Sequence, residues 1–251
     1  MEKIIHTLLF SCLIVTLIGY RACAFSIKSD STQKDADSKV KVSASFTTTM
    51  NSRFIWRGLE LGDHPHIQPS VTLSMGKFFV GAWASHGIGP VAFDTNIPGY
   101  KEVIPYIGYT FSSAFTLLIL DHYNPNFGSI SNFKDNGEGS NTIEARALFN
   151  FWKFDVLASI NFYNDPKYSN YLEIGYNATL NKGIKIRPLV SFTPTESPFN
   201  GTSEFAFTQV GVITSKDFNL TKEIGMTLRG DFIVNPNADK FYAAFGVAFK
   251  L

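Results

Sequence analysis

Apolar and polar residues alternate along much of the chain, most regularly in the final segment, Lys240–Leu251. One face of that segment is wholly apolar: Phe241, Ala243, Phe245, Val247, Phe249 and Leu251. A period of two places successive side chains on opposite faces of a β-strand. A strand of roughly ten residues is long enough to cross the apolar layer of a membrane when it is tilted. The segment is therefore predicted to be a membrane-spanning strand.

The same alternation recurs upstream in segments of about ten residues bounded by turn residues, and no amphipathic helix exceeds two turns. We expect twelve strands: Val40–Met50, His66–Met75, Phe78–His86, Lys101–Phe111, Ala114–Tyr123, Asn141–Asn150, Phe154–Asn164, Ser169–Leu180, Ile184–Thr193, Ser203–Ser215, Lys222–Val234 and Lys240–Leu251. Pro69, Pro105 and Pro188 each remove a ladder hydrogen bond within a predicted strand, so bulges or shifted registers are expected there. Residues 203–215 alternate poorly, which leaves the orientation of Phe207 open.

Short and long connections alternate between these strands. The short ones are Gly76-Lys77, Ser112-Ser113, Phe151 to Lys153, Asn181 to Gly183 and Lys216 to Thr221. Tight periplasmic turns and longer outer loops are typical of outer-membrane barrels, and an even strand count places both termini in the periplasm. Because unpaired sheet edges cannot lie in hydrocarbon, the sheet must close on itself. Residues 40–251 are therefore predicted to be an all-β fold, a closed antiparallel transmembrane β-barrel in the bacterial outer membrane.

The first residues have the composition of a targeting segment. Lys3 precedes an apolar stretch, Ile4–Tyr20, and Ala22-Cys23-Ala24 offers a small-residue cleavage site, so residues 1–24 are predicted to be a signal peptide. Lipid attachment at Cys23 is a weaker alternative. Residues 25–39 are polar, charged and without a period, which predicts a flexible periplasmic linker.

Loss of that segment changes the composition of the remaining chain. Both cysteines, Cys12 and Cys23, lie within it, so disulfides, thiolate metal sites and a cysteine nucleophile are excluded from the mature chain. Two of the 22 basic residues, Lys3 and Arg21, and one of the 21 acidic residues, Glu2, are removed as well, leaving 20 of each sign. Such a balance argues against a nucleic-acid partner.

The residues predicted to face the lumen carry balanced charge. The candidates for the lumen lining are Glu144, Arg146, Glu173, Arg187, Arg229 and Asp231. Glu144 and Arg146, and Arg229 and Asp231, stand two apart on single strands, where neighbouring side chains can pair. A barrel of about twelve strands leaves a narrow aqueous space. Paired side chains of this kind form a balanced lattice, which could either conduct small solutes with weak selectivity or fill the barrel. A channel for acidic sugars should instead have basic walls.

The most distinctive run is Ser52-Arg53-Phe54-Ile55-Trp56-Arg57-Gly58, followed by Ile67-Gln68-Pro69-Ser70. Its place before the second strand predicts an outer-mouth segment, in which Arg53, Trp56 and Arg57 either touch lipopolysaccharide phosphates or form an ordinary aromatic girdle with solvated charge. The run resembles the N-terminal signature of a family of small outer-membrane β-barrels of Gram-negative bacteria, Bacteroidota among them, that carry a porin label. The resemblance implies a barrel with a porin-like role and supplies no catalytic residues.

The final strand also resembles the closing strand of bacterial outer-membrane barrels. Gly246, Phe249 and Leu251 match that assembly signal, whereas a terminal Leu in place of Phe, and Ala244 where a polar residue is usual, depart from it. The resemblance implies that the barrel assembly machinery is a partner through this strand.

Catalytic and metal chemistry receive little support. No histidine is followed two residues on by a serine, the pair used by outer-membrane lipid-modifying enzymes, and Asp121-His122 lacks a nucleophile or a second carboxylate beside it. The weak metal candidates are His64, His66, His86 and His122, with scattered surface histidines as the commoner explanation. We expect no enzyme and no cofactor.

The expected function is passive passage of small solutes through a narrow, charge-balanced lumen. A non-conducting structural or adhesive barrel that acts through the outer loops 51–65 and 124–140 is the alternative. A lipid-modifying enzyme and a soluble secreted β-protein are weaker ones. Conductance across a planar bilayer separates the first two, and heat-modifiable migration on a gel separates a barrel from a soluble sandwich.

Overall fold

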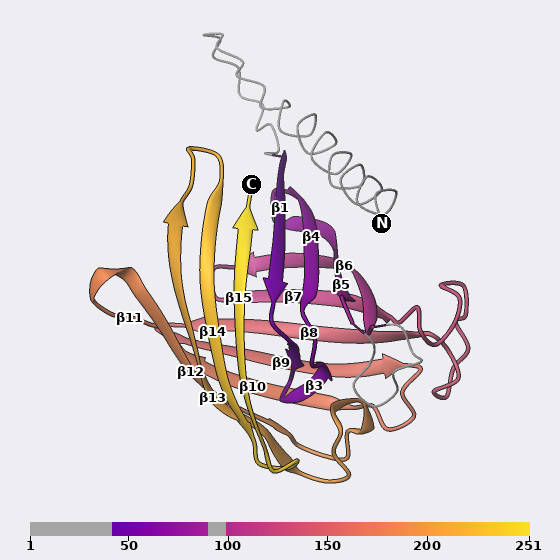
Figure 1. Ribbon diagram of the computed structural model, residues 1–251. Coiled ribbons are helices and arrows are strands. Elements are labelled where there is room, and N and C mark those ends of the chain that lie inside the picture. Colours follow the sequence, from indigo (N-terminus) through magenta and orange to yellow (C-terminus); the bar gives the residue numbers. More distant parts are fainter. Residues whose placement is uncertain (1–41, 90–98) are drawn as a thin grey trace, which may run out of the picture. The chain divides into compact units, whose positions relative to one another are not determined.

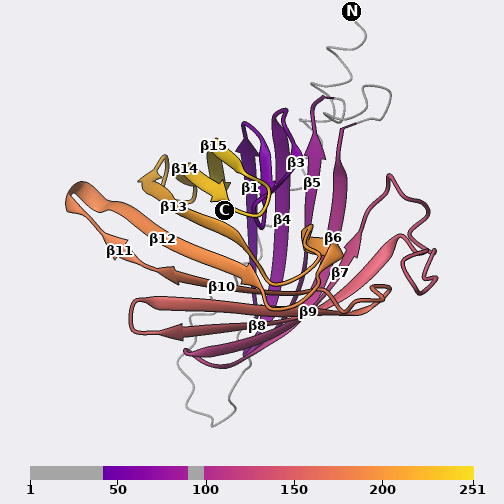
Figure 2. The ribbon, with the colours of Figure 1, turned by 90° about the horizontal axis from the view of Figure 1, so that it is seen from below.

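The alternating segments form one large antiparallel sheet, seen from two directions in Figures 1 and 2. The computed structural model describes residues 42–89 and 99–251, so the predicted signal peptide and linker lie outside the described residues. All described residues belong to the unit Val40–Leu251. Within them, no helix is both long enough and apolar enough to span a membrane.

The strands follow the predicted ranges closely. They are β1 Val42–Asn51, β4 His66–Met75, β5 Phe78–Gly87, β6 Lys101–Ser112, β7 Phe115–Tyr123, β8 Asn141–Phe151, β9 Phe154–Tyr163, β10 Asn170–Tyr176, β11 Ala178–Thr179, β12 Ile184–Thr193, β13 Ala206–Asn219, β14 Gly225–Asn235 and β15 Lys240–Lys250. Two single turns of 3-10 helix, η1 at Asn181–Gly183 and η2 at Pro198–Asn200, lie in connections. A separate hairpin, β2 Phe54–Trp56 and β3 Leu59–Gly62, interrupts the first outer loop.

The sheet closes on itself. Each strand pairs with its neighbours in sequence, β1 pairs with β15 from Thr47↔Lys250 to Asn51↔Gly246, and β10 pairs with β12. The sheet has 13 segments, but β10 and β11 are two pieces of one strand that break at Asn177 and both pair with β12. The result is twelve strands around a barrel without a free edge, which confirms the predicted fold class.

The barrel is apolar outside and polar inside. Exposed large apolar side chains project from alternate positions, among them Val71, Leu73, Ile107, Leu228 and Phe245. The residues between them face inward and are mostly hydroxyl, amide or charged side chains, of which Glu144, Asn161 and Ser191 have no solvent-accessible surface. A sheet with an apolar outer face meets hydrocarbon favourably only when every backbone group is paired, as closure ensures here.

Aromatic rings mark the ends of the strands beside the short turns. A row on β6, β7 and β8 joins Tyr109 to Phe111, Phe111 to Phe115 and Phe115 to Phe149, with ring centroids 4.8, 5.2 and 4.9 Å apart. Rings of this kind suit the membrane–water interface, where an apolar body meets a polar boundary.

Two register expectations need correction. The bulges expected at the prolines are absent at Pro69, Pro105 and Pro188, because the residue pairing has the same register on both sides of each proline. The irregular strand, β13, runs from Ala206 to Asn219, so it begins three residues later and ends four residues later than expected. A bulge opposite Ser191 and Phe192 lets Thr208 and Gln209 both turn inward, while Phe207 remains 44% exposed on the outside.

Candidate functional site

The hairpin β2–β3 folds into the barrel. Its two-residue turn, Arg57-Gly58, has φ angles of 51° and 82°, the left-handed conformation that a type I′ hairpin turn requires. Going around the barrel from β1 and β4, where the hairpin begins and ends, β9 and β10 are the strands farthest away. The turn contacts residues of those strands and their neighbours, so the hairpin crosses the lumen from one wall to the other.

Arg57, at the tip, is bound to the far wall by charge-assisted hydrogen bonds. Its Nη2 donates to Glu144 Oε2 at 2.6 Å and to Ser159 Oγ at 3.0 Å, and its Nη1 donates to Asn200 Oδ1 at 3.1 Å. The guanidinium carbon lies 4.4 Å from the ring centroids of both Trp56 and Tyr171. Pairing, hydrogen bonding and ring contact together offset the cost of burying this cation.

Gly58 is fixed by contacts on β13 and β14. Its carbonyl oxygen accepts a hydrogen bond from Asn235 Nδ2 at 2.9 Å. A Cβ atom at this position would collide with the carbonyl oxygen of Thr208. The tip therefore rests directly on the backbone of the opposite wall, an approach that only glycine permits.

The two ends of the hairpin pack on aromatic groups. The Phe54 ring centroid lies 5.3 Å from that of His66 and 5.7 Å from that of Trp83, and Trp56 lies 5.5 Å from Phe199. The outer-mouth predictions are therefore wrong for Trp56 and Arg57, which lie inside the barrel rather than at a lipid girdle or on lipopolysaccharide. Arg53, 36% exposed, pairs with Glu60 of the same hairpin at 2.8 Å.

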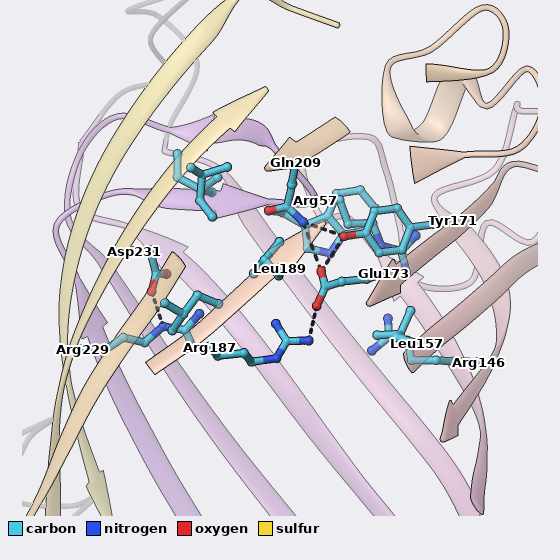
Figure 3. Close-up of a pocket in the computed structure, with 14 residues that line it drawn as sticks. Arg57, Arg146, Leu157, Tyr171, Glu173, Arg187, Leu189, Gln209, Arg229 and Asp231 are labelled. Carbon is cyan, nitrogen blue, oxygen red and sulfur yellow. Dashed lines mark hydrogen bonds and ion pairs between the residues drawn. The ribbon is translucent and has the colours of Figure 1, made fainter. Parts of the chain in front are cut away.

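A cavity of about 440 Å³ lies beside the hairpin tip (Figure 3). It is lined by Ile55, Trp56, Arg57, Arg146, Leu157, Tyr171, Glu173, Arg187, Leu189, Gln209, Ile213, Arg229, Asp231 and Ile233. The structure thus brings together five of the six lumen candidates, and the sixth, Glu144, accepts a hydrogen bond from Arg146 Nε at 2.7 Å. Their role toward a solute stays a prediction.

The charged groups around the cavity are paired. Arg229 donates to Asp231 at 2.7 Å, and Arg187 pairs with Asp155 and, at 2.7 Å, with Glu173. Four arginines line the cavity, and their partners are four carboxylates, those of Glu144, Asp155, Glu173 and Asp231. The formal charge of this set is therefore zero, as in the balanced lattice expected from the sequence.

Three of the four histidines have a polar partner of their own. His66 Nδ1 is 2.9 Å from Ser85 Oγ, His64 pairs with Asp63 at 2.6 Å, and His122 pairs with Glu102 at 3.0 Å. His86 is exposed. Among the described residues, no group of three or more histidine, cysteine or acidic side chains could hold a metal ion. The competing explanation, surface histidines, is wrong for His66 and His122, which are 1% and 4% exposed.

Asp121 and His122 do not form an acid–base pair. Consecutive residues of β7 point to opposite faces, so only His122 faces the lumen. Its ring centroid lies 5.9 Å from that of Trp56 and 5.4 Å from that of Phe199. The imidazole is thus enclosed by rings and has no open face toward the cavity.

Sequence reasoning missed the hairpin and the apolar part of the cavity. A signal for the hairpin was present, because Arg57-Gly58 stands between the apolar run 54–56 and the alternating run Leu59-Glu60-Leu61, as a two-residue hairpin turn does. The inward-facing Leu189 and Ile233 also had a signal, because they stand two residues after the lumen candidates Arg187 and Asp231 and so fall on the same face of their strands.

No family model matches the sequence, and no curated protein matches it. Among solved structures, the chain is similar to the KdgM porin, with 10% identity, 82% of this chain and 97% of that chain covered, and a TM-score of 0.47. It is similar to an outer-membrane channel from Pseudomonas putida F1, with 7% identity, 87% and 99% covered, and a TM-score of 0.40. The described strand pairings themselves establish a closed barrel with an apolar exterior, the architecture that spans the bacterial outer membrane.

Proposed function

We propose that this barrel is a passive pore for small polar solutes, narrowest at the level where the hairpin β2–β3 crosses the lumen. The observation that carries the proposal is the cavity of about 440 Å³, polar and charged within a barrel whose outside is apolar. Charged side chains in an interior each need a partner or water, and a water-filled path supplies water to those that line it.

The charge pattern supports weak selectivity. Each cavity arginine has a carboxylate partner within hydrogen-bonding distance, so the set as a whole attracts neither cations nor anions from afar. Selection then depends on size and on short-range contacts. The level of the hairpin tip limits size, because Arg57 and Trp56 occupy the lumen there.

The non-conducting barrel remains the second candidate, and one observation favours it. Arg57 is 7% exposed and bound to the far wall by three side chains, which makes the hairpin a firmly seated obstruction. In that case the outer loops would carry the function and the charged interior would hold the barrel together.

Single-channel recording in a planar bilayer tests the proposal. The full chain, folded into detergent and verified by heat-modifiable migration, should conduct in discrete steps, and Arg57→Ala should give larger steps because the tip loses its anchors. Lys167→Gln, an exposed loop cation paired with Glu196, is the matched control and should leave the step size unchanged. A silent wild-type chain with a conducting Arg57→Ala variant would support the non-conducting barrel instead.

We also infer two partners and a family. The barrel assembly machinery would engage β15, which closes the barrel against β1. Lipopolysaccharide would meet the outer rim, where Arg53 is the partly exposed remnant of the predicted outer-mouth set. Membership of the porin-labelled barrel family rests on the run Ser52 to Gly58.

A further inference from the structure

We propose that the lumen cavity is a binding site for a small organic monoanion with an apolar body, such as an aromatic or medium-chain monocarboxylate. The inference deepens the proposed function, on which it rests in one respect: the site lies on the path that a solute would take. It follows from three features of the cavity, namely an apolar patch, a surplus of hydrogen-bond donors and a paired charge set.

The apolar patch is unusual for a water-filled lumen. Leu189 and Ile233, 6% and 3% exposed, form a cluster with Tyr242, and Ile55 and Ile213 pack against it. Leu189, Ile213, Ile233 and Ile55 all line the cavity. Leu189 and Ile233 are nearly covered already, whereas Ile55 and Ile213 are half-buried and leave apolar surface facing the cavity. Covering that surface with a ligand lowers the free energy. A solute with an apolar body is therefore held better here than a fully hydrated one.

The donors of the cavity outnumber its open acceptors. Arg229 donates through Nε to Asp231, and among the described residues no hydrogen bond engages its two terminal nitrogens. Its side chain is 46% exposed, so these nitrogens are accessible to a ligand. Arg146 donates through Nε to Glu144 in the same way, again with its terminal nitrogens unengaged within the described part of the chain. Figure 3 places Arg229 on one side of the cavity and Arg146 on the other.

The acceptors are largely occupied. Glu173 Oε1 accepts from Arg187, and its Oε2 accepts from Tyr171 at 2.6 Å and from Gln209 at 3.1 Å. Among the described carboxylates of the cavity, an ammonium group would find one oxygen without a hydrogen bond, Asp231 Oδ2, against the four terminal nitrogens of Arg229 and Arg146 that are open to a carboxylate. A carboxylate would find paired N–H groups of a guanidinium, the geometry that carboxylates prefer.

The paired charges limit the ligand to one negative charge. With four arginines facing four carboxylates, a single added anion is accommodated by the spare N–H groups. A second or third anionic group would meet Asp231 or Glu173 at short range without a further cation to offset it. A pocket of 300–1,000 Å³ is the usual range for small-molecule sites, and the cavity of about 440 Å³ falls within it.

Isothermal titration calorimetry on the folded full chain in detergent tests the site. The probes are phenylacetate, phenylacetamide, phenethylamine and acetate, so that charge and apolar body are varied separately. Phenylacetate should bind about tenfold tighter than each of the other three, because it alone combines a carboxylate that a guanidinium can pair with and an apolar body that the cavity can cover. Equal binding of phenylacetate and phenylacetamide would overturn the proposal.

Arg229→Gln should abolish the preference for phenylacetate over phenylacetamide. Arg229→Lys should keep part of it, because lysine supplies the positive charge but not the planar guanidinium that pairs with both carboxylate oxygens. Lys167→Gln should bind as the wild type does. Unchanged preference in a folded Arg229→Gln barrel would remove the assigned role of Arg229 and with it the proposed site. Conductance without phenylacetate binding would contradict the binding site and leave the proposed pore function standing. Binding without conductance would support the binding site and contradict the pore function.

Discussion

The two walls of the barrel differ in the polar side chains that face the interior. The wall formed by β1 and β4 carries mostly neutral hydroxyl groups at its inward positions, with Ser43, Ser45, Thr47 and Thr49 on β1 and Ser70, Thr72 and Ser74 on β4. The wall from β8 to β14 carries the paired charges around Glu144, Glu173 and Asp231. Hydroxyl groups bond to water or to one another at little cost, whereas buried charges need partners on neighbouring strands.

The hairpin β2–β3 connects these two walls. It extends into the lumen from the neutral wall, and Arg57 at its tip binds the charged wall. The comparison indicates that the charged wall does more than line the lumen, because it also holds the element that narrows it. Substitutions on the charged wall should therefore affect stability and transport together, while those on the neutral wall should have small effects on either.

The largest effect is expected from Glu144→Ala. Glu144 is 0% exposed and is the shared partner of Arg57 and Arg146, so its loss leaves the buried Arg57 and the partly buried Arg146 without their carboxylate. The free energy of unfolding should fall by about 3–5 kcal/mol, the usual cost of breaking a buried pair. Urea titration followed by heat-modifiable gel migration measures it. A loss below that of the neutral-wall substitution given below would contradict the comparison.

Gly58→Ala should cost less. The residue has φ of 82°, and a Cβ there meets the carbonyl of Thr208, so the hairpin tip must lift from the wall. We expect a loss of about 1–3 kcal/mol, the range for strained backbone conformations. Gly183→Ala is the matched control, since Gly183 has φ of 73° but open space around it, and it should be the milder of the two. Equal losses of stability in the two variants would mean that the hairpin tip does not rest against Thr208.

Thr72→Val tests the neutral wall. Thr72 Oγ1 lies 2.6 Å from Tyr106 Oη, and valine removes this hydrogen bond while keeping the shape of the side chain. The expected loss is about 1 kcal/mol, the net contribution of one hydrogen bond. Single-channel step size should be unchanged. A changed step size would show that the neutral wall also shapes the conducting path.

Asp231→Asn should give the smallest effect, a change in ion preference alone. The carboxylate of Asp231 is the partner of Arg229, and its removal leaves the cavity with one uncompensated cation. The reversal potential in a salt gradient should move toward anion preference. Asp239→Asn, in the outer turn between β14 and β15, is the control and should leave the reversal potential where it is. A shift toward cations in Asp231→Asn would contradict the balanced charge set.

The strands and most charged lumen residues were predictable because alternation is a local property. Each strand repeats with period two, so Glu144, Arg146 and Arg229 fall on the inner face as soon as the strand range is known. The inward fold of the hairpin was not predictable in that way. It depends on the contact of Arg57 with Glu144, 87 residues away, and with Asn200, 143 residues away. The inward position of Gln209 likewise depends on a bulge that is set by the partner strand.

The separation in sequence between the hairpin tip and its anchors has a consequence for the order of folding. Gly58 bonds to Asn235, 177 residues later, and its backbone rests against Thr208. Contacts of such long range form late, because the intervening chain must first be ordered. The hairpin therefore cannot reach its resting place before β13 and β14 have joined the sheet. A barrel in which β13 and β14 are not yet paired therefore has an interior that the hairpin tip does not narrow.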